Sequence, residues 1–529
     1  MVAVAESRHI AAVSLLLALL LRSAVVHAGK LLVVPMDGSH WTAMQAVAEE
    51  LGSRGNTVVV VIPEVSMRLG PSRHCVTRTY PVPYGRDVLD HLQARHTHGL
   101  HSTQPFLQRV ASRLSAVGNL TRFLQTTCES LLYNQEMMWY LREQQFDAVL
   151  TDPVVPTGVI VAEHLSVPVV LMLRGIPCGL DFAATACPSP PSFVPRFFTH
   201  NTDRMSFQQR VLNTLVSLLE PLLCSVIYRP FDGVASRFLQ RDVTLAEMLS
   251  RASLWLMRFD FTFEFPRPLM PNMVLVGGIN CAVRNPLPQE LQKFVNESGE
   301  HGFIVFTLGS VVSQMPVEKA KLFFEAFRQI PQRVLWRYTG PTPDNLPENV
   351  KLMKWLPQND LLGHPKARAF ITHGGTHGIY EGICNAVPMV MMPLFGDQGD
   401  NVQRMAVRGV AEVLSIFEVT TETLLQALNK VINDTSYKDN MLKLSAVHKD
   451  RPMEPLDLAV FWTEFVMRHK GADHLRPAAH HLNWVQYHCL DVIGLLVVIV
   501  VTVVMVTVKC CAFCFRKCCM RKSLKKKED

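Results

Sequence analysis

Residues 370–381 read Phe-Ile-Thr-His-Gly-Gly-Thr-His-Gly-Ile-Tyr-Glu, an apolar run followed by a glycine-containing turn and helix-forming sequence. We expect a strand that ends at Thr372 and a helix that begins directly after it. The glycines at 374, 375 and 378 allow a ligand to approach the backbone closely. Because a helix N-terminus presents free amide groups and about half a positive charge, this turn is a candidate pyrophosphate site.

The alternation of strands and helices continues on both sides of this turn. Apolar runs predict strands in the second half at Phe303–Leu308, Val334–Tyr338, Val350–Met353, Ala369–Thr372 and Pro388–Met392. In the first half, Trp41–Leu51 has helical spacing, and strands are expected at Lys30–Val34, Thr57–Ile62, Phe146–Thr151 and Val167–Leu173. A polar, proline-rich stretch around Asn285–Pro288 separates the halves. The pattern predicts two Rossmann-like, doubly wound α/β domains facing a cleft.

Polar and aromatic side chains accompany the glycine turn. His373 can donate a hydrogen bond to a phosphate oxygen, and Glu381, two turns later, can accept from ribose hydroxyls. An ordinary glycine-containing turn with an incidental histidine is the alternative. Three further features favour a binding site over an ordinary turn. They are the aromatic ring of Trp355, the amide of Gln358 and the acid–amide pair Asp397 and Gln398.

The first half offers a candidate general base. His40 opens the first helix directly after the first strand, and Asp152 follows the strand that ends at Thr151. In a parallel sheet both lie at the edge where ligands bind. A neutral imidazole can take a proton from a phenol or alcohol, and a carboxylate on the other ring nitrogen fixes the tautomer and stabilises the cation. A capping or packing role for His40 is the alternative.

The two ends of the chain have the composition of targeting segments. Residues 1–28 contain Arg8, an apolar block and small residues at a cleavage position, which predicts a signal peptide. The uncharged run Val492–Val508, within residues 491–509, would be about 25 Å long as a helix, which suits the endoplasmic reticulum bilayer of about 27 Å. We expect a single transmembrane helix rather than a core helix.

The last twenty residues, 510–529, are strongly basic. They account, with Lys509, for nearly all of the formal net charge of +7, so the body is close to neutral and nucleic-acid binding is not indicated. The positive-inside rule places this tail in the cytosol and the body in the lumen. Lys526 and Lys527 have the spacing of a di-lysine retrieval signal. Palmitoylation is plausible at the tail cysteines Cys510, Cys511, Cys514, Cys518 and Cys519.

Other features of the luminal part carry weaker expectations. Three glycosylation sequons begin at Asn119, Asn296 and Asn433. The eight remaining cysteines are scattered, and we expect no disulfide scaffold. Arg210–Tyr228 is an apolar helical stretch, which is either core packing or a peripheral membrane contact. The cluster His96, His98 and His101 is expected to be a polar loop rather than a zinc site. The chain also lacks the Asp-Xaa-Asp pair that metal-using sugar transferases carry, so no metal is expected.

The stretch from Trp355 to Gln398 resembles the UDP-glycosyltransferase signature. Similarity extends over nearly the whole mature chain and is strongest from about residue 270 onward. Met270–Met273, Gly277–Cys281, Pro393–Gln398 and the region from His448 to His469 resemble the phenol- and bilirubin-conjugating branch of the vertebrate UDP-glucuronosyltransferases, family 1.

The resemblance implies a GT-B glycosyltransferase fold and a role for each site residue. His40 and Asp152 would be catalytic. Trp355 would stack on uracil and Gln358 would contact the nucleoside. Ser310 and His373 would contact phosphate, Glu381 would bind ribose, and Asp397 with Gln398 would hold sugar hydroxyls. Gly375 and His377 are further donor-site candidates. Arg258 is a speculative partner of the glucuronate carboxylate, with a surface or interdomain ion pair as the alternative.

The expected activity is inverting transfer of glucuronic acid from UDP-glucuronate to small lipophilic acceptors such as phenols, bilirubin, steroids and xenobiotics, without a cofactor. UDP-glucose or another UDP-hexose as donor, and a silent lipophile-binding subunit of a heterodimer, are the alternatives. Expected partners include the bilayer and further copies or relatives of the chain. The expected divisions are 29–285 for the acceptor domain, 286–450 for the donor domain and 451–490 for C-terminal helices that return toward the first domain.

Overall fold

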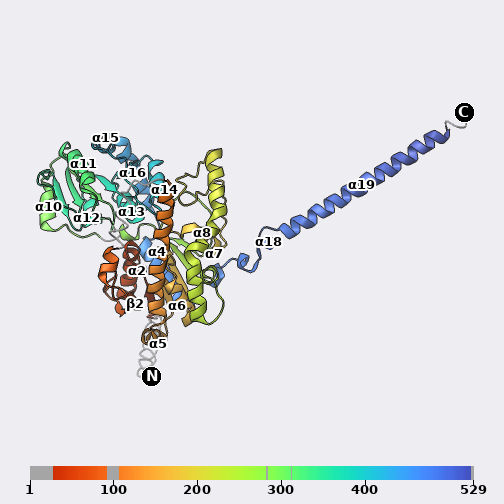
Figure 1. Ribbon diagram of the computed structural model, residues 1–529, viewed down its shortest axis with the longest axis horizontal. Coiled ribbons are helices and arrows are strands. Elements are labelled where there is room, and N and C mark those ends of the chain that lie inside the picture. The colour runs from red at the N-terminus through yellow and green to blue at the C-terminus, as the bar shows by residue number, and fades with distance from the viewer. Residues whose placement is uncertain (1–27, 92–105, 282–283, 311, 526–529) are drawn as a thin grey trace, which may run out of the picture. The chain divides into compact units, whose positions relative to one another are not determined.

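The computed structural model describes residues 28–91, 106–281, 284–310 and 312–525. Residues up to Leu475 form one compact unit, and residues from Arg476 onward form a second. The first unit contains two parallel sheets, each with its own set of helices (Figure 1). The predicted pair of doubly wound α/β sheets is therefore confirmed.

The first sheet has seven parallel strands in the order β3-β2-β1-β4-β5-β6-β7. Its inner strands consist of apolar, mostly β-branched residues buried on both faces, as expected of a covered parallel sheet. Strand order reverses between β1 and β4, which pair from Leu31 with Ala148 to Val34 with Thr151. The strands are β1 (Lys30–Val34), β2 (Thr57–Pro63), β3 (Val76–Tyr80), β4 (Ala148–Thr151), β5 (Val169–Leu173), β6 (Leu254–Met257) and β7 (Met273–Leu275).

The second sheet has six parallel strands in the order β10-β9-β8-β11-β12-β13. Its reversal lies between β8 and β11, where Thr307 pairs with Thr372. Phe306 and Trp336 stack with ring centroids 4.7 Å apart in the core beneath α11. The strands are β8 (Phe303–Thr307), β9 (Arg333–Arg337), β10 (Val350–Met353), β11 (Ala367–Thr372), β12 (Met389–Met391) and β13 (Ala411–Val413).

Helices cover the faces of both sheets (Figure 1). Those of the first half are α2 (Ser39–Ser53), α4 (Phe106–Leu132), α5 (Gln135–Glu143), α6 (Thr157–Leu165), α7 (Leu180–Thr185), α8 (Phe207–Leu239) and α9 (Leu245–Ser250), with the 3-10 turns η1 (Pro177–Gly179) and η2 (Ile279–Cys281). Those of the second half are α10 (Gln289–Asn296), α11 (Val317–Arg328), α12 (Gln358–Leu362), α13 (Thr376–Cys384), α14 (Gln398–Ala406), α15 (Thr421–Asn433) and α16 (Thr435–Lys449).

Helix α17 (Pro455–His469) follows the second sheet but packs on the first. Its buried residues Ala459 and Val460 belong to the same apolar cluster as Leu31 and Val33 of β1. Asn56, at the start of β2, donates a 3.0 Å hydrogen bond to Glu464 of this helix. The end of the first unit is thereby fixed to its beginning.

Two disulfides join luminal cysteines, which the prediction of no disulfide scaffold did not anticipate. Cys178 is bonded to Cys224, and Cys281 is bonded to Cys384. The partners are 46 and 103 residues apart, so no short spacing reveals them. The second bond joins η2 to the end of α13 and thus ties the end of the first half to the helix that begins at the glycine turn.

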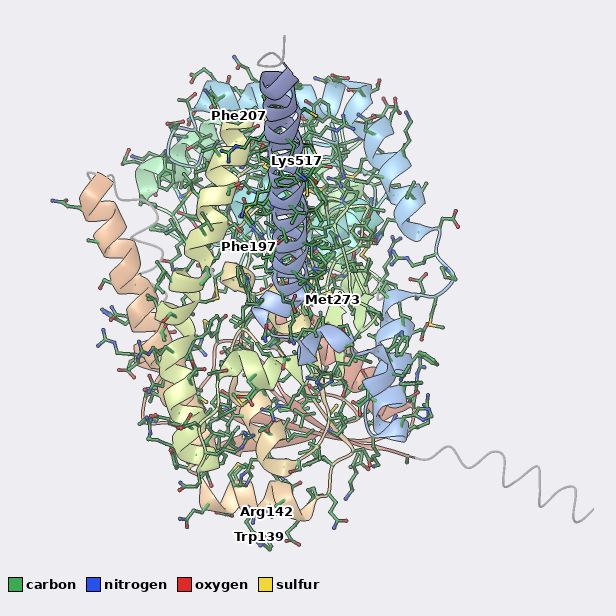
Figure 2. All side chains as sticks on the ribbon, turned by 90° about the vertical axis from the view of Figure 1, so that its right-hand side faces the viewer. Trp139, Arg142, Phe197, Phe207, Met273 and Lys517 are labelled. Carbon is green, nitrogen blue, oxygen red and sulfur yellow. A yellow bond between two sulfur atoms is a disulfide. The ribbon has the colours of Figure 1, made fainter. Side chains whose placement is uncertain are left out.

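Helix α8 is exposed over its first two-thirds and buried over its last third. Its exposed apolar side chains, which we call the α8 apolar face, are Phe207, Val211, Leu212, Leu215, Leu218, Leu219, Leu222 and Val226. Tyr228, Phe231, Val234 and Ala235 are buried against the domain. Core packing therefore does not explain the Arg210–Tyr228 stretch. Figure 2 shows this long helix with Phe207 at one end.

The first unit ends with η3 (Asp473–Leu475). The second unit contains η4 (Ala478–His481), α18 (Trp484–Tyr487) and the long helix α19 (Leu490–Lys525). Within residues 490–518 of α19 the most apolar stretch is fully exposed, and the helix is long and apolar enough to cross a membrane. The helix continues without a break into the basic tail. The signal peptide, the histidine cluster and the di-lysine pair lie outside the described residues.

Candidate functional site

His40 and Asp152 meet at the switch point of the first sheet. His40 lies in the first turn of α2, after a turn made possible by Gly38 at φ 85°. Asp152 follows β4, the neighbour of β1. The imidazole Nδ1 lies 2.7 Å from Asp152 Oδ2, and these residues are 112 positions apart in sequence. The carboxylate is 1% exposed and the imidazole 29% exposed, so the ring alone faces solvent.

The Asp152 carboxylate is held in its charged form. Burial alone would raise its pKa, but His40, Arg258 and the backbone N–H of Val154 act in the opposite direction and lower the pKa below its usual value. A charged Asp152 accepts the proton on Nδ1 of His40. This tautomer leaves Nε2 of His40 unprotonated, and Nε2 is then the atom that can receive a proton from an acceptor.

Arg258 follows β6 and connects the two halves. Its Nη2 lies 3.8 Å from Asp152 Oδ2 and 3.1 Å from His40 Nδ1, and its Nη1 donates a 3.2 Å hydrogen bond to Nε2 of His377. Its side chain is only 8% exposed, which excludes the surface ion pair. Its ion pair with Asp152 lies within the first half, and its contact with the second half is the hydrogen bond to the neutral His377.

His377 brings the second half to the His40–Asp152 pair. It lies in the first turn of α13, and its ring also bonds to the backbone of Ser39. Burial and the charge of Arg258 lower the pKa of His377 to about 3, so the ring is neutral and accepts from Arg258. The N-terminus of α13 therefore lies beside His40.

His373 stands just before α13 at the end of β11. A Cβ on Gly309 or Gly375 would come within 2.5 or 2.6 Å of its ring, so the ring fills a space that only glycine leaves open. Burial lowers the pKa of His373 to about 4, and the ring is neutral near pH 7. Among the described residues its buried Nδ1 has no hydrogen-bond partner. Gly375 caps α13 without a side-chain bond, which leaves helix amide groups free for an anion.

Ser310 and Trp355 lie at the mouth of the cleft. Both line a cavity of about 260 Å³ together with Arg337, the last residue of β9. Trp355 is 52% exposed, which leaves its ring available for stacking. The guanidinium of Arg337 donates to the backbone carbonyls of Gly309 and Ser310. Arg337 was not predicted from the sequence, although its position at the carboxyl end of a strand was a usable signal.

Gln358 and Glu381 bind each other. Gln358 Nε2 donates to one carboxylate oxygen of Glu381, and Asn280 Nδ2 donates to the other at 3.1 Å. Burial nevertheless raises the pKa of Glu381 to about 7. Asn280 comes from η2, in the first half, and was also missed. The predicted ribose-binding carboxylate is thus in place at α13 and is held from both halves.

Asp397 and Gln398, the pair predicted to hold sugar hydroxyls, lie at the start of α14. Asp397 Oδ2 accepts a 2.8 Å hydrogen bond from Asn401. Gln398 is 4% exposed, and its Oε1 accepts from the backbone N–H groups of Leu394 and Phe395 at 2.8 and 3.1 Å. Because the oxygen of Gln398 holds this turn, only its NH₂ group is available to a ligand.

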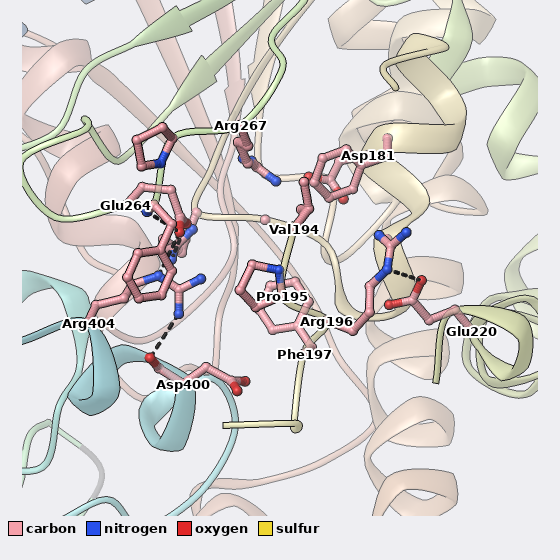
Figure 3. Close-up of a pocket in the computed structure, with 16 residues that line it drawn as sticks. Asp181, Val194, Pro195, Arg196, Phe197, Glu220, Glu264, Arg267, Asp400 and Arg404 are labelled. Atoms are coloured by element: carbon pink, nitrogen blue, oxygen red, sulfur yellow. Dashed lines mark hydrogen bonds and ion pairs between the residues drawn. The ribbon is translucent and has the colours of Figure 1, made fainter. Parts of the chain in front are cut away.

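A buried ionic cluster joins the halves behind the site (Figure 3). Glu264 forms ion pairs with Arg174 at 2.7 Å and with Arg404 of α14 at 2.6 Å. Burial would raise the pKa of Glu264, but these arginines lower it strongly. Asp400 of α14 accepts the backbone N–H groups of Phe198 and His200 at 2.7 and 2.8 Å. The space between these groups is only about 30 Å³, room for roughly one water, so it is no acceptor pocket.

One group of described residues has the geometry of a metal site. Ligand atoms of Cys281, Cys384 and His448 lie within 4.8 Å of one another. Both sulfur atoms are in the disulfide, however, and a disulfide offers no thiolate to a metal. His448 also bonds to Asp260 at 2.6 Å.

Comparisons with solved structures agree with this fold. Spinosyn forosaminyltransferase SpnP is 19% identical, with a TM-score of 0.54 over 83% of this chain and 99% of the other. CalG4, the calicheamicin glycosyltransferase, is 16% identical, with a TM-score of 0.54 over 84% and 99%. At these identities the likeness concerns the fold alone, which is the GT-B arrangement of two Rossmann-like sheets.

Comparisons of sequence reach further. Human UDP-glucuronosyltransferase 1A1 is 52% identical over 97% of this chain and 96% of its own length. The rat protein of the same name is 54% identical over 93% and 92%. The family model described as "UDP-glucoronosyl and UDP-glucosyl transferase" matches residues 29–526. With this match over nearly its whole length, the chain belongs to the UDP-glucuronosyl and UDP-glucosyl transferase family of enzymes.

Proposed function

We propose that this chain transfers glucuronic acid from UDP-glucuronate to a hydroxyl group of a small lipophilic acceptor, with inversion at the anomeric carbon. The observation that carries the proposal is the meeting of the His40–Asp152 pair with the first turn of α13 through Arg258 and His377. A base and a phosphate site on facing sheets are what a displacement at the anomeric carbon requires.

The chemical step follows from the tautomer of His40. Nε2 takes the proton of the acceptor hydroxyl as its oxygen bonds to the anomeric carbon, and UDP leaves from the opposite face. The charged Asp152 then stabilises the imidazolium. General-base action supplies roughly 10²- to 10⁴-fold in rate, so charge stabilisation of the leaving UDP must supply much of the remainder.

The donor residues keep the roles that the sequence suggested. Trp355 stacks on uracil, Gln358 contacts the nucleoside and Glu381 accepts from ribose hydroxyls. Ser310, His373 and the α13 amide groups after Gly375 hold phosphate, with His377 beside them. The sugar contacts are Asp397 and the NH₂ group of Gln398. We assign Arg258 to positioning His40 and Asp152, because its guanidinium is occupied by them and by His377.

The identity of the donor sugar is tested directly with the purified full-length chain. We expect turnover with UDP-glucuronate and a phenol acceptor, with a β-glucuronide as the product detected by mass spectrometry. The relatives named as UDP-glucuronosyltransferases favour this donor over UDP-glucose, UDP-galactose and UDP-N-acetylglucosamine. Faster turnover with an uncharged UDP-hexose, or no transfer with any donor, would contradict the proposal. The second result would instead fit a silent heterodimer subunit.

No divalent ion is needed in this proposal. The neutral His373 and the amide groups of α13 meet the phosphate charge, and the sequence has no Asp-Xaa-Asp pair. Adding EDTA to the purified enzyme should therefore leave kcat within about twofold. A loss of activity that Mg²⁺ or Mn²⁺ restores would show that a metal takes part.

The cellular setting is proposed from the sequence signals together with α19. The chain is membrane-anchored by α19, and we propose a single span in the endoplasmic reticulum, luminal catalytic domains with the divisions 29–285, 286–450 and 451–490, and a cytosolic tail. Asn296 and Asn433 are exposed at helix ends and suit glycosylation, whereas Asn119 is half-buried within α4. Association with copies or relatives of the chain is part of the same proposal.

A further inference from the structure

The cavity beside Trp355 contains more positive charge than its own residues balance. It is lined by Gly38, Met67, Arg68, Arg86, Ser310, Arg337 and Trp355, three arginines without a carboxylate among them. The first four come from the first half and the last three from the second. Arg86 has an ion pair with Asp90 at 3.1 Å outside this set. No such pair is found for Arg68 or Arg337 in the part of the chain that the structure describes.

Arg68 reaches across the cleft onto the ring predicted to bind uracil. Its guanidinium carbon lies 4.2 Å from the centroid of the Trp355 ring, and that of Arg337 lies 5.3 Å away. A guanidinium at this distance is held by cation–π attraction, which is weak at exposed sites. The contact is weak enough for a bound nucleotide to replace it.

The backbone of Arg68 is fixed to the turn that carries the catalytic base. Asp37, three residues before His40, accepts hydrogen bonds from the backbone N–H groups of Met67 at 2.6 Å and Arg68 at 2.9 Å. The side chain of Arg68 is exposed, whereas its backbone is held at a constant place relative to His40.

Two like charges face each other in this cavity. Burial and the charge of Arg68 lower the pKa of Arg337 to about 10, and burial lowers the pKa of Arg68. Arg337 is kept in place by bonds to backbone carbonyls, which do not neutralise its charge. An anion between the two guanidinium groups would remove this repulsion.

We propose that Arg68, from the acceptor-binding half, binds an anionic oxygen of the UDP-sugar donor after leaving the ring of Trp355. The anion is either the diphosphate or the sugar carboxylate, which share the planar, bidentate recognition that arginine provides. This proposal rests on the proposed function, because it needs a UDP-sugar in the cleft. A donor held by Arg68 would contact both halves of the chain. Because Asp37 fixes the backbone of Arg68, donor binding would also depend on the turn that positions His40.

The test compares Arg68→Ala with Arg73→Ala in the full-length protein. Arg73 is exposed on the same loop, so the control removes the same charge outside the cavity. Binding of UDP and of UDP-glucuronate is measured by titration calorimetry, which does not depend on turnover, and thermal melting shows that each variant is folded. Loss of a charge-assisted hydrogen bond should weaken binding by roughly 10- to 100-fold.

The two anions give different outcomes. If Arg68 binds the diphosphate, Arg68→Ala weakens UDP and UDP-glucuronate equally. If it binds the carboxylate, only UDP-glucuronate is weakened, and UDP-glucose is unaffected. Binding of all three ligands within twofold of the wild type, or an equal loss in Arg73→Ala, would overturn the proposal. Absence of turnover in the wild type would overturn the proposed function but leave this binding test intact.

Discussion

At the scale of single residues, the protonation state of Glu381 controls a measurable property. Burial raises its pKa to about 7, so in the donor-free protein it is half protonated near neutral pH. In the proposed function, ribose hydroxyls donate to the charged form of Glu381, and donor binding would lower its pKa. Donor affinity therefore increases as pH rises through 7 and falls as pH drops below it.

We expect the Kd of UDP-glucuronate, whose diphosphate charge is constant here, to be about tenfold larger at pH 6 than at pH 8. Calorimetry across this range measures the change. Glu381→Gln should flatten the profile, since the amide does not titrate. An unchanged slope in that variant would assign the titration to another group.

The sequence predicted which strand ends would meet better than it predicted individual side-chain contacts. His40 and Asp152 could be paired from sequence because adjacent parallel strands bring their carboxyl ends together. Arg337 and Asn280 could not be chosen among many arginines and asparagines without coordinates. The sequence also could not show that Gln358 bonds to Glu381, or that Gln398 bonds to the backbone of its own turn. Both contacts depend on side-chain orientation.

At the scale of elements, the α8 apolar face makes a prediction about membranes. We expect the chain truncated after Leu475, which ends the first compact unit, to bind lipid vesicles through this face. Leu218→Glu with Leu222→Glu should reduce flotation with vesicles several-fold. Val447→Glu, on α16 and similarly exposed, is the control and should have no effect. Equal flotation of all three proteins would show that the face does not contact lipid.

The Cys281–Cys384 disulfide belongs to the same scale, because it ties η2 to α13 across 103 residues. Replacing both cysteines by alanine should lower the free energy of unfolding by about 2–4 kcal/mol, since the unfolded chain is no longer restrained. Thermal melting of the double variant, with and without reductant, measures this. A wild type whose melting temperature is the same in reductant would mean that the bond contributes no stability.

Most strands could be predicted from the sequence, the four-residue β10 among them, but β3, β6, β7 and β13 could not. β1 and β10 begin and end where the sequence placed them. β3 is a polar edge strand, and β6, β7 and β13 have only three or four residues each. Such short strands form because a neighbouring strand offers hydrogen bonds, which local sequence does not encode.

At the scale of the whole molecule, contacts between the halves position the chemistry. Arg258 and His377 join the base to α13, Asp400 holds the 198–200 segment on α14, and Arg68 crosses to Trp355. Each contact pairs a group from one sheet with a group from the other. The sequence predicted that two sheets face a cleft, but it could not show which side chains cross it.

The most direct test of the central claim is a paired measurement on His40→Ala: turnover with UDP-glucuronate and the Kd of UDP on the same preparation. The account predicts that kcat falls by at least 10²-fold while the Kd stays within about twofold, because His40 removes the proton and α13 binds the diphosphate. A variant that keeps its turnover, or one that loses UDP affinity while kcat is unchanged, would contradict the role of His40 as the base.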